Sequence, residues 1–230
     1  MKKRIVFATV LLALLGLSTM TFAQSERKLS PFDAVSVTGN IEVVLVPGDE
    51  EKAVVEVFGI DEGDVSVYVN HNTLRLQLIN SMFKKGERAR IQVTYKQIRS
   101  VKGNAGSRIS NEGHVIEADK LYVRATSGSE VRLSVKANML DAGAMEGGVL
   151  NLEGSADTQD ATAATGGRYD ALELACQRTY VRANTGGEAE VVALEFLDAV
   201  ANTGGVIRYR GNPNEQNSKT VLSGEVQKIE

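Results

Sequence analysis

The chain has 230 residues, of which 43% are hydrophobic and 24% are charged, and it contains no tryptophan. This composition is that of an ordinary soluble protein with one or two domains. The net charge of −3 at pH 7 and the lack of a basic patch argue against nucleic acid as a partner, and a single cysteine excludes an internal disulfide.

The first 23 residues have the order of a secretory signal peptide. Basic residues 2–4 precede an apolar run, 5–17, and small residues stand at positions −3 and −1 of a cleavage site after Ala23. The alternative is a membrane anchor, but the apolar run is short for a bilayer span. We therefore predict cleavage before Gln24 and export to the periplasm, the outer surface or the medium, with no stable membrane insertion afterwards.

Residues 24–30 are polar, and we predict a flexible leader there. Alternating apolar residues then predict short strands, which we place at 34–38, 41–46, 53–58, 65–69, 74–78 and 89–95. The segments 65–69 and 74–78 should form a hairpin, because the asparagines of Asn70-His71-Asn72-Thr73 tolerate a left-handed backbone. We predict that 31–100 is an antiparallel region that lacks the repeat found in 101–211, and that it covers one end of that repeat region.

A repeat dominates residues 101–211. Six tight turns are centred on glycine, and their first glycines are separated by 18 to 22 residues; these are Gly106, Gly128, Gly147, Gly166, Gly186 and Gly204. Such a period is the mark of a solenoid, in which each repeat forms one turn of the chain, or rung, stacked on the next. Residues 212–230 form a polar segment in which 221–229 could make a last strand.

The residues around each first glycine repeat as well. The position three before is always small, as in Ala183 and Ala201, and positions five before and three after are apolar. Apolar residues two apart predict strands with one buried face. We predict an all-β fold, a right-handed, single-stranded, parallel β-helix, in which the first glycines supply both a positive φ and space.

Few residues suggest chemistry. His71 and His114 lie in turn contexts and are most simply exposed; a zinc site would need more ligands nearby. Cys176 alternates with other residues of a strand and is most simply a buried small hydrophobe. We expect no cofactor and no metal.

Carboxylates could pair across rungs about 4.8 Å apart, as a polysaccharide lyase or hydrolase would need. The candidates are Asp141, Asp157, Asp160, Asp170 and Asp198. The sequence lacks the long loops that would wall a substrate groove, so we do not expect an enzyme.

Polar residues recur at the turns, one and two positions before the first glycine. They are Thr126, Ser127, Thr165, Asn184, Thr185, Asn202 and Thr203. Stacked, they would form a polar ladder along one edge. The ladder either joins the rungs by hydrogen bonds or presents hydroxyl and amide groups to a glycan or a protein.

Two stretches resemble a known family. The opening, Phe32-x-x-Val35-x-Val37-x-Gly39-Asn40-Ile41, and the ending, Tyr209-Arg210-Gly211-Asn212-Pro213 with Ser223-Gly224-Glu225-Val226, are similar to the head GIN domain family, described as putative auto-transporter adhesins. The resemblance covers 31–229. It implies a signal peptide, a right-handed β-helical fold and an origin typical of Bacteroidetes, and it carries no catalytic residues.

Together these observations predict an exported, non-enzymatic binding protein of the cell envelope, an adhesin for a surface glycan or protein. One alternative is an envelope scaffold that self-associates through the solenoid end and so forms a homo-oligomer. A second alternative is a β-helix polysaccharide lyase or hydrolase. The ligand is not identified by the sequence.

Overall fold

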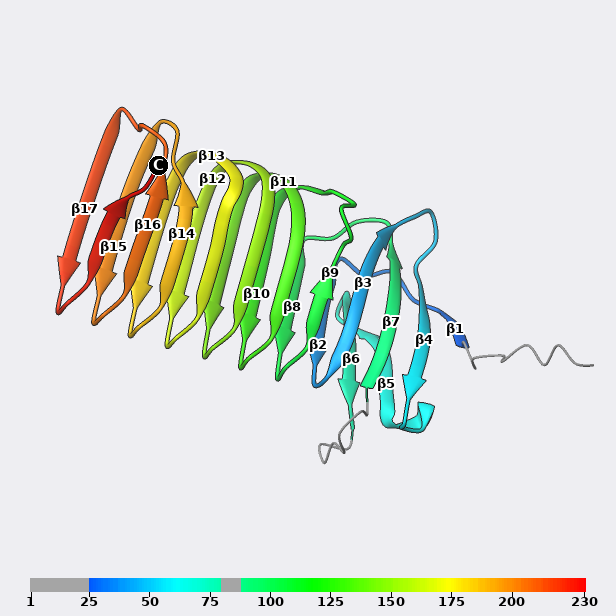
Figure 1. Ribbon diagram of the computed structural model, residues 1–230. Helices are drawn as coiled ribbons and strands as arrows, with labels where there is room; N and C mark the ends of the chain where they lie inside the picture. Colours follow the sequence, from blue (N-terminus) through cyan, green and yellow to red (C-terminus); the bar gives the residue numbers. More distant parts are fainter. Residues whose placement is uncertain (1–24, 80–87) are drawn as a thin grey trace, which may run out of the picture.

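The structure is a computed structural model, and it describes residues 25–79 and 88–230 (Figure 1). The predicted signal peptide, and residues 80–87 between the predicted strands 74–78 and 89–95, lie outside the described residues. The fold is all-β: a parallel β-solenoid of about 7 turns follows an N-terminal region with a mixed sheet. The described residues contain no helix with the length and hydropathy needed to cross a membrane.

The solenoid strands pair in parallel from each rung to the next. They are β8 (Ser100–Asn104), β9 (Arg108–Ser110), β10 (Ile116–Thr126), β11 (Glu130–Met145), β12 (Val149–Ala164), β13 (Arg168–Asn184), β14 (Glu188–Val192), β15 (Phe196–Asn202), β16 (Val206–Arg210), β17 (Glu215–Val221) and β18 (Glu225–Lys228). The long strands β11 to β13 bend midway and so serve both layers. The tight turns lie along one edge and the bends along the other (Figure 1).

The turns explain why glycine recurs. In each of the six turns, the first glycine and the residue before it both have positive φ, and the latter lies between 48° and 53°. Two central residues with positive φ define a type I′ turn, which suits the twist of the strands it joins. The predicted inward columns are confirmed: the small column, including Ala183 and Ala201, is fully buried.

In the four turns that have a Gly-Gly pair, the second glycine, not the first, meets the preceding rung. A Cβ on Gly186 would meet nothing within 4 Å, whereas a Cβ on Gly187 would lie 2.3 Å from the carbonyl oxygen of Ala163 in the preceding rung. Gly148, Gly167, Gly205 and Gly224 are crowded in the same way, at 2.1 to 2.2 Å. The prediction that the first glycine supplies both conformation and space is therefore half wrong.

The N-terminal region is mixed rather than antiparallel, because its strands β2 and β3 pair in parallel with the solenoid. Its elements are β1 (Ser25–Lys28), β2 (Ala34–Thr38), β3 (Ile41–Pro47), β4 (Lys52–Phe58), a short 3₁₀ helix (Glu62–Asp64), β5 (Val65–Asn70), β6 (Thr73–Leu78) and β7 (Arg88–Tyr95). The only antiparallel pairs among the described strands are β1–β4, β4–β7 and the confirmed hairpin β5–β6.

The hairpin-like unit β2–β3 is itself a rung. Strand β2 lies between β6 and β8, and β3 lies between β7 and β9, with parallel pairing on both sides. The turn at Gly39 joins the stack, since its N–H donates to the carbonyl of Asn104 at 3.2 Å. The repeat therefore begins earlier than the sequence indicated. The expected flexible leader also differs, because residues 25–28 form β1 against β4.

The core runs the length of the solenoid and is mostly apolar; among its few buried polar side chains, Gln159 and Thr179 form a network with Tyr169. Tyr169 donates its hydroxyl hydrogen to Gln159, and Gln159 and Thr179 both donate to the carbonyl oxygen of Val192. These contacts satisfy a carbonyl at the point where β14 ends. Cys176 is fully buried as predicted, and its thiol lies 3.2 Å from the carbonyl oxygen of Arg178.

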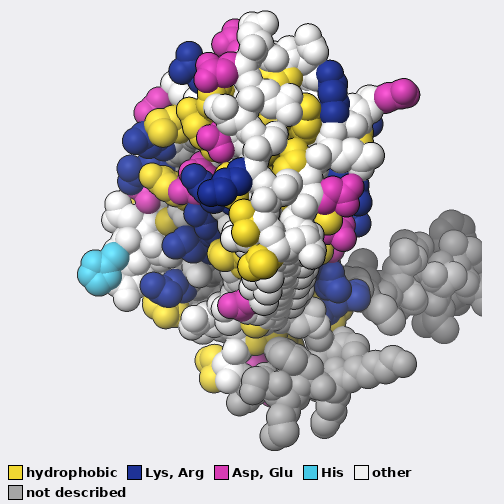
Figure 2. Space-filling model, turned by 90° about the vertical axis from the view of Figure 1, so that its left-hand side faces the viewer, with side chains coloured by type: hydrophobic (Ala, Val, Ile, Leu, Met, Phe, Trp, Pro, Cys, Tyr) yellow, Lys and Arg dark blue, Asp and Glu magenta, His cyan; other side chains and the backbone are white. Residues whose placement is uncertain are grey.

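The last rung differs from the others. Its turn has positive φ at Leu222 and Ser223, so the predicted strand 221–229 is shortened to β18. The polar stretch before the turn forms β17, which pairs with β15 on one side, and every residue of β17 is exposed. Figure 2 looks onto this end of the molecule.

Candidate functional site

The predicted polar ladder lies at the tight-turn edge, and the structure unites only part of it. Thr165, Thr185 and Thr203 are exposed and stack on three consecutive rungs. The backbone joins these rungs, because Gly166 N–H donates to the carbonyl oxygen of Thr185 and Gly186 N–H donates to that of Thr203. Asn184 and Asn202 form a second column beside them. These five residues are the stacked ladder.

Thr126 and Ser127 stand apart from the stacked ladder, because Met145, Glu146 and Ala164 interrupt both columns. Thr126 donates to the carbonyl of Gly103 at 3.2 Å, and Ser127 donates to Glu146 at 2.7 Å. These two hydroxyl groups join adjacent rungs, which is the structural role considered for the ladder. A binding role for the ladder stays a prediction.

A different surface concentrates more chemistry. On the outer face of the layer that contains β15, consecutive rungs place five residues in one column: Tyr122, Asp141, Asp160, Tyr180 and Asp198. We call this column and the side chains beside it the aspartate face. Sequence reasoning treated the aspartates only as separate candidates. The five residues each stand six positions before the first glycine of their turn, so the column could have been found from this shared position in the sequence.

Arginines beside the column hold two of its carboxylates. Arg124 donates to the Asp141 carboxylate at 2.6 Å and to its carbonyl oxygen at 2.9 Å, while Arg182 donates to Asp160 at 3.1 Å. Arg124 reaches Asp141 by crossing Gly143, where an added Cβ would lie 3.4 Å from the arginine Cδ. A glycine at this outward position therefore leaves room for the arginine stem.

Exposed apolar groups flank the carboxylates. Tyr122 is 45% exposed and Met139 is 49% exposed. Together with Lys120, Thr158 and the two aspartates, they line a hollow of about 150 Å³. Tyr122 and Met139 therefore place two large apolar side chains in one hollow, beside the two aspartates.

A second hollow lies further along the same face, towards the C-terminal end. It measures about 360 Å³ and is lined by Arg178, Tyr180, Glu195, Phe196, Asn214 and Glu215. The rings of Tyr180 and Phe196 are tilted by 44° with centroids 5.2 Å apart, so the two rings form one aromatic block. Tyr122 and Tyr180 stand three rungs apart, a span of about 14 Å at the usual strand spacing.

The carboxylates of the aspartate face lie in an environment unlike that of a glycosidase acid. Each of the paired aspartates is about half exposed and accepts hydrogen bonds from an arginine. The general acid of a glycosidase instead needs an apolar environment that keeps it protonated. Among the described residues, no three His, Cys, Asp or Glu side chains come together in a way that could hold a metal ion.

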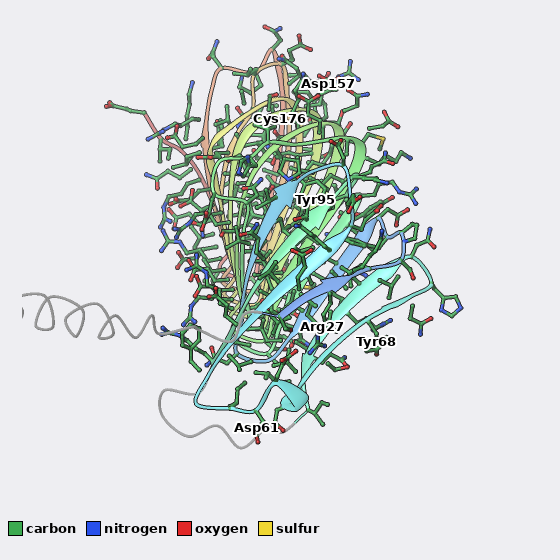
Figure 3. The ribbon with its side chains drawn as sticks, turned by 90° about the vertical axis from the view of Figure 1, so that its right-hand side faces the viewer. Arg27, Asp61, Tyr68, Tyr95, Asp157 and Cys176 are labelled. Atoms are coloured by element: carbon green, nitrogen blue, oxygen red, sulfur yellow. The ribbon has the colours of Figure 1, made fainter. Side chains whose placement is uncertain are left out.

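The other candidates from the sequence lie elsewhere. His71 and His114 are exposed in turns. Burial raises the pKa of the Cys176 thiol, which disfavours the thiolate that a nucleophile requires. Figure 3 shows Cys176 next to Asp157, far from Tyr68 on β5. Asp170 lies on the opposite outer face, near Arg132 and Glu173.

Three solved structures share this fold. A putative adhesin from Bacteroides fragilis has 19% identity and a TM-score of 0.79, covering 90% of this chain and 96% of its own. Putative adhesins from Parabacteroides distasonis and Parabacteroides merdae have 17% and 15% identity and TM-scores of 0.70 and 0.66, with the same coverage. These likenesses show the fold.

No curated protein matches the sequence. A family model matches residues 31–213, and its description is "Putative auto-transporter adhesin, head GIN domain". The matched range begins before β2 and ends after β16, so it includes the rung formed by β2 and β3 and most of the solenoid. The chain therefore belongs to the family with this description, the head GIN domain family.

Proposed function

We propose that this protein is an exported, non-enzymatic binding protein of the cell envelope, and that it recognises a surface glycan through the aspartate face. The observation that carries the proposal is the alignment of Tyr122, Asp141, Asp160 and Tyr180 on consecutive rungs. The family name supports adhesion in general. The basic, apolar and small-residue order of residues 1–23 supports export.

Sugars offer the two kinds of surface that this face complements. A sugar ring has an apolar face that packs on an aromatic ring, and its rim carries hydroxyl groups that both donate and accept hydrogen bonds. Tyr122 supplies the ring, Asp141 and Asp160 supply acceptors, and Arg124 and Arg182 supply donors. The arginine contacts also fix the carboxylates in position, so that less conformational entropy is lost on binding.

The span of the face suits a chain rather than a single sugar. Two aromatic positions about 14 Å apart, with carboxylates on the two rungs between them, can contact several consecutive units of an extended glycan. Each contact is weak and open to solvent, so affinity must come from several of them together. The shallow hollows favour binding of a chain along its length over enclosure of a small molecule.

The first experiment is a glycan array with the purified protein, followed by calorimetry with the best ligand. We expect Tyr122→Ala and Asp160→Asn each to weaken binding about fivefold, from loss of one stacking or hydrogen-bonding contact worth ~1 kcal/mol. Tyr68→Ala is the matched control, because Tyr68 is 41% exposed but lies on β5 in the N-terminal region.

Three outcomes would contradict the proposal. The wild-type protein could bind no glycan, which would favour a protein ligand. The Tyr68 variant could lose as much affinity as the Tyr122 variant, which would place the site elsewhere. The protein could cleave an acidic polysaccharide, which would replace a binding function with the lyase or hydrolase alternative.

Export is tested separately by intact-mass measurement, which should show a mature chain beginning at or near Gln24.

A further inference from the structure

The C-terminal end of the solenoid carries an open strand edge. Strand β17 pairs with β15 on one side only, and all seven of its residues are exposed. Unpaired strand edges are usually made short, or are blocked by proline, a bulge, an inward-pointing charge or charged side chains such as lysine. Strand β17 is of ordinary length, contains no proline or bulge, and has uncharged residues at its three inward positions, 216, 218 and 220; its two charges, on Glu215 and Lys219, lie on the outer side and have opposite signs.

The direction of its backbone groups follows from contacts at the two ends of the strand. Glu215 N–H donates to the carbonyl of Glu195 at 3.3 Å, and the carbonyl of Val221 accepts from Thr203 N–H at 3.2 Å. Both contacts point back into the solenoid. Because consecutive residues of a strand turn their N–H and C=O groups to opposite sides, the groups of Gln216, Ser218 and Thr220 face the open edge.

The side chains on the outer side of β17 are complementary to themselves. Glu215 and Lys219 have opposite charges, both are exposed, and within the described part of the chain neither has an ion-pair partner. They stand at equal distances from Asn217 along the strand. If a second copy of β17 lies antiparallel with Asn217 opposite Asn217, each Glu215 faces the Lys219 of the other copy.

Other registers are worse. Moving the centre to Lys219 places the two lysines opposite each other, and moving it to Glu215 does the same for the two glutamates; like charges in opposed positions are destabilising. The register centred on Asn217 also pairs Gln216 with Ser218, so the residues whose backbone groups face the edge meet each other. Backbone alternation allows every register centred on a single residue, and among these only the one centred on Asn217 places Glu215 opposite Lys219.

The geometry points to a tail-to-tail homodimer in which the β17 strands of two copies pair antiparallel about Asn217. Gln216 and Ser218 exchange backbone hydrogen bonds across the interface. Glu215 and Lys219 occupy the pairs without backbone hydrogen bonds, where opposed side chains come closest. The two-fold symmetry closes the assembly at two copies, because the interface uses the same patch from both.

The dimer would extend the aspartate face. Asn217 is the residue that follows Asp198 in the central column. Pairing at Asn217 therefore joins the columns of the two copies into one surface. This consequence rests on the proposed function, but the dimer itself does not, since β17 contains none of the residues Tyr122, Asp141, Asp160 or Tyr180.

Sedimentation equilibrium of two charge-reversed variants tests the pairing. Glu215→Lys and Lys219→Glu each convert two attractive pairs into two repulsive ones, and we expect each to weaken dimerisation about tenfold or more. An equimolar mixture of the two variants restores both attractive pairs. We expect the mixture to form a mixed dimer with the affinity of the wild-type protein.

A backbone variant provides an independent readout. Ser218→Pro removes an N–H that faces the open edge, so it should abolish dimerisation and leave the thermal midpoint of unfolding nearly unchanged. Lys219→Pro is the matched control, because its N–H faces β15 and its loss should lower the midpoint.

Several results would overturn the inference. A wild-type protein that stays monomeric at every accessible concentration would do so, as would two charge-reversed variants that dimerise alone as tightly as the wild type. Assemblies that grow beyond two copies would indicate pairing of β17 with the other end of the solenoid. Glycan binding by a monomer would leave the proposed function intact while refuting the dimer.

Discussion

Neighbouring glycines of one turn should respond very differently to the same substitution. At Gly187 the backbone has an ordinary φ, but an added Cβ would lie 2.3 Å from the carbonyl oxygen and 2.4 Å from the carbonyl carbon of Ala163. At Gly186 the φ is +69°, and an added Cβ would meet nothing within 4 Å. Alanine at 187 thus meets a steric obstacle, and alanine at 186 meets only backbone strain.

The expected costs can be worked out from these contacts. To accommodate Gly187→Ala, two rungs must separate by about 1 Å, although Glu188 N–H to Gly167 at 2.9 Å holds them together. Overpacking costs about 1–3 kcal/mol, and the weakening of one or two backbone hydrogen bonds adds about 1 kcal/mol each, so we expect ~2–5 kcal/mol in total. Gly186→Ala should cost only ~1 kcal/mol, the penalty for a left-handed alanine.

Urea denaturation of both variants measures the difference, with the slope of the unfolding free energy against urea fitted in common. We expect the midpoint of Gly187→Ala to fall well below that of Gly186→Ala. Equal losses, or a larger loss at Gly186, would mean that the rungs are not packed through the second glycine. The roles assigned to the two glycines would then be reversed.

Two further predictions concern the core. Burial raises the pKa of Tyr169, so its neutral form is favoured in the folded state; the stability it contributes is complete below the unfolded pKa of about 10 and is lost as pH rises above it. Wild-type unfolding free energy, measured by urea titration from neutral to alkaline pH, should therefore fall more steeply above about pH 10 than that of Tyr169→Phe; parallel curves would contradict this. Cys176 should react with a thiol reagent only after unfolding, and Cys176→Ser should cost ~1–3 kcal/mol in a thermal melt, because a buried hydroxyl is more costly to desolvate than a thiol; rapid labelling of the native protein would contradict its burial.

The solenoid could be predicted because its period is present in the local sequence. The six turns of 101–211 each have a glycine at the same place, and the inward columns have a small or apolar residue about one rung later. The crowding at Gly187 could not be assigned from the sequence, since a Gly-Gly pair does not show which glycine meets the preceding rung. The aspartate face was overlooked because its members, such as Tyr122 and Asp160, share a column but not a residue type.

The rung formed by β2 and β3 could not be predicted for a different reason. Its neighbours on one side are β6 and β7, and on the other side β8 and β9, all of which come later in the chain. Pairing over such separations leaves no local pattern. Alternation within 34–38 and 41–46 predicts two strands correctly, but it says nothing of their partners.

The position of the rung formed by β2 and β3 also constrains the order of assembly during synthesis. Strands β2 and β3 are made before every strand that flanks them, so one edge of each stays unpaired until β6 and β7 are made, and the other until β8 and β9 are made. The rungs from β10 to β13 need only their immediate successors and can close as they are made. Rungs of the middle should therefore fold first, with the amino-terminal strands docking onto them afterwards. A kinetic experiment would see the earliest part of the chain acquire protection last.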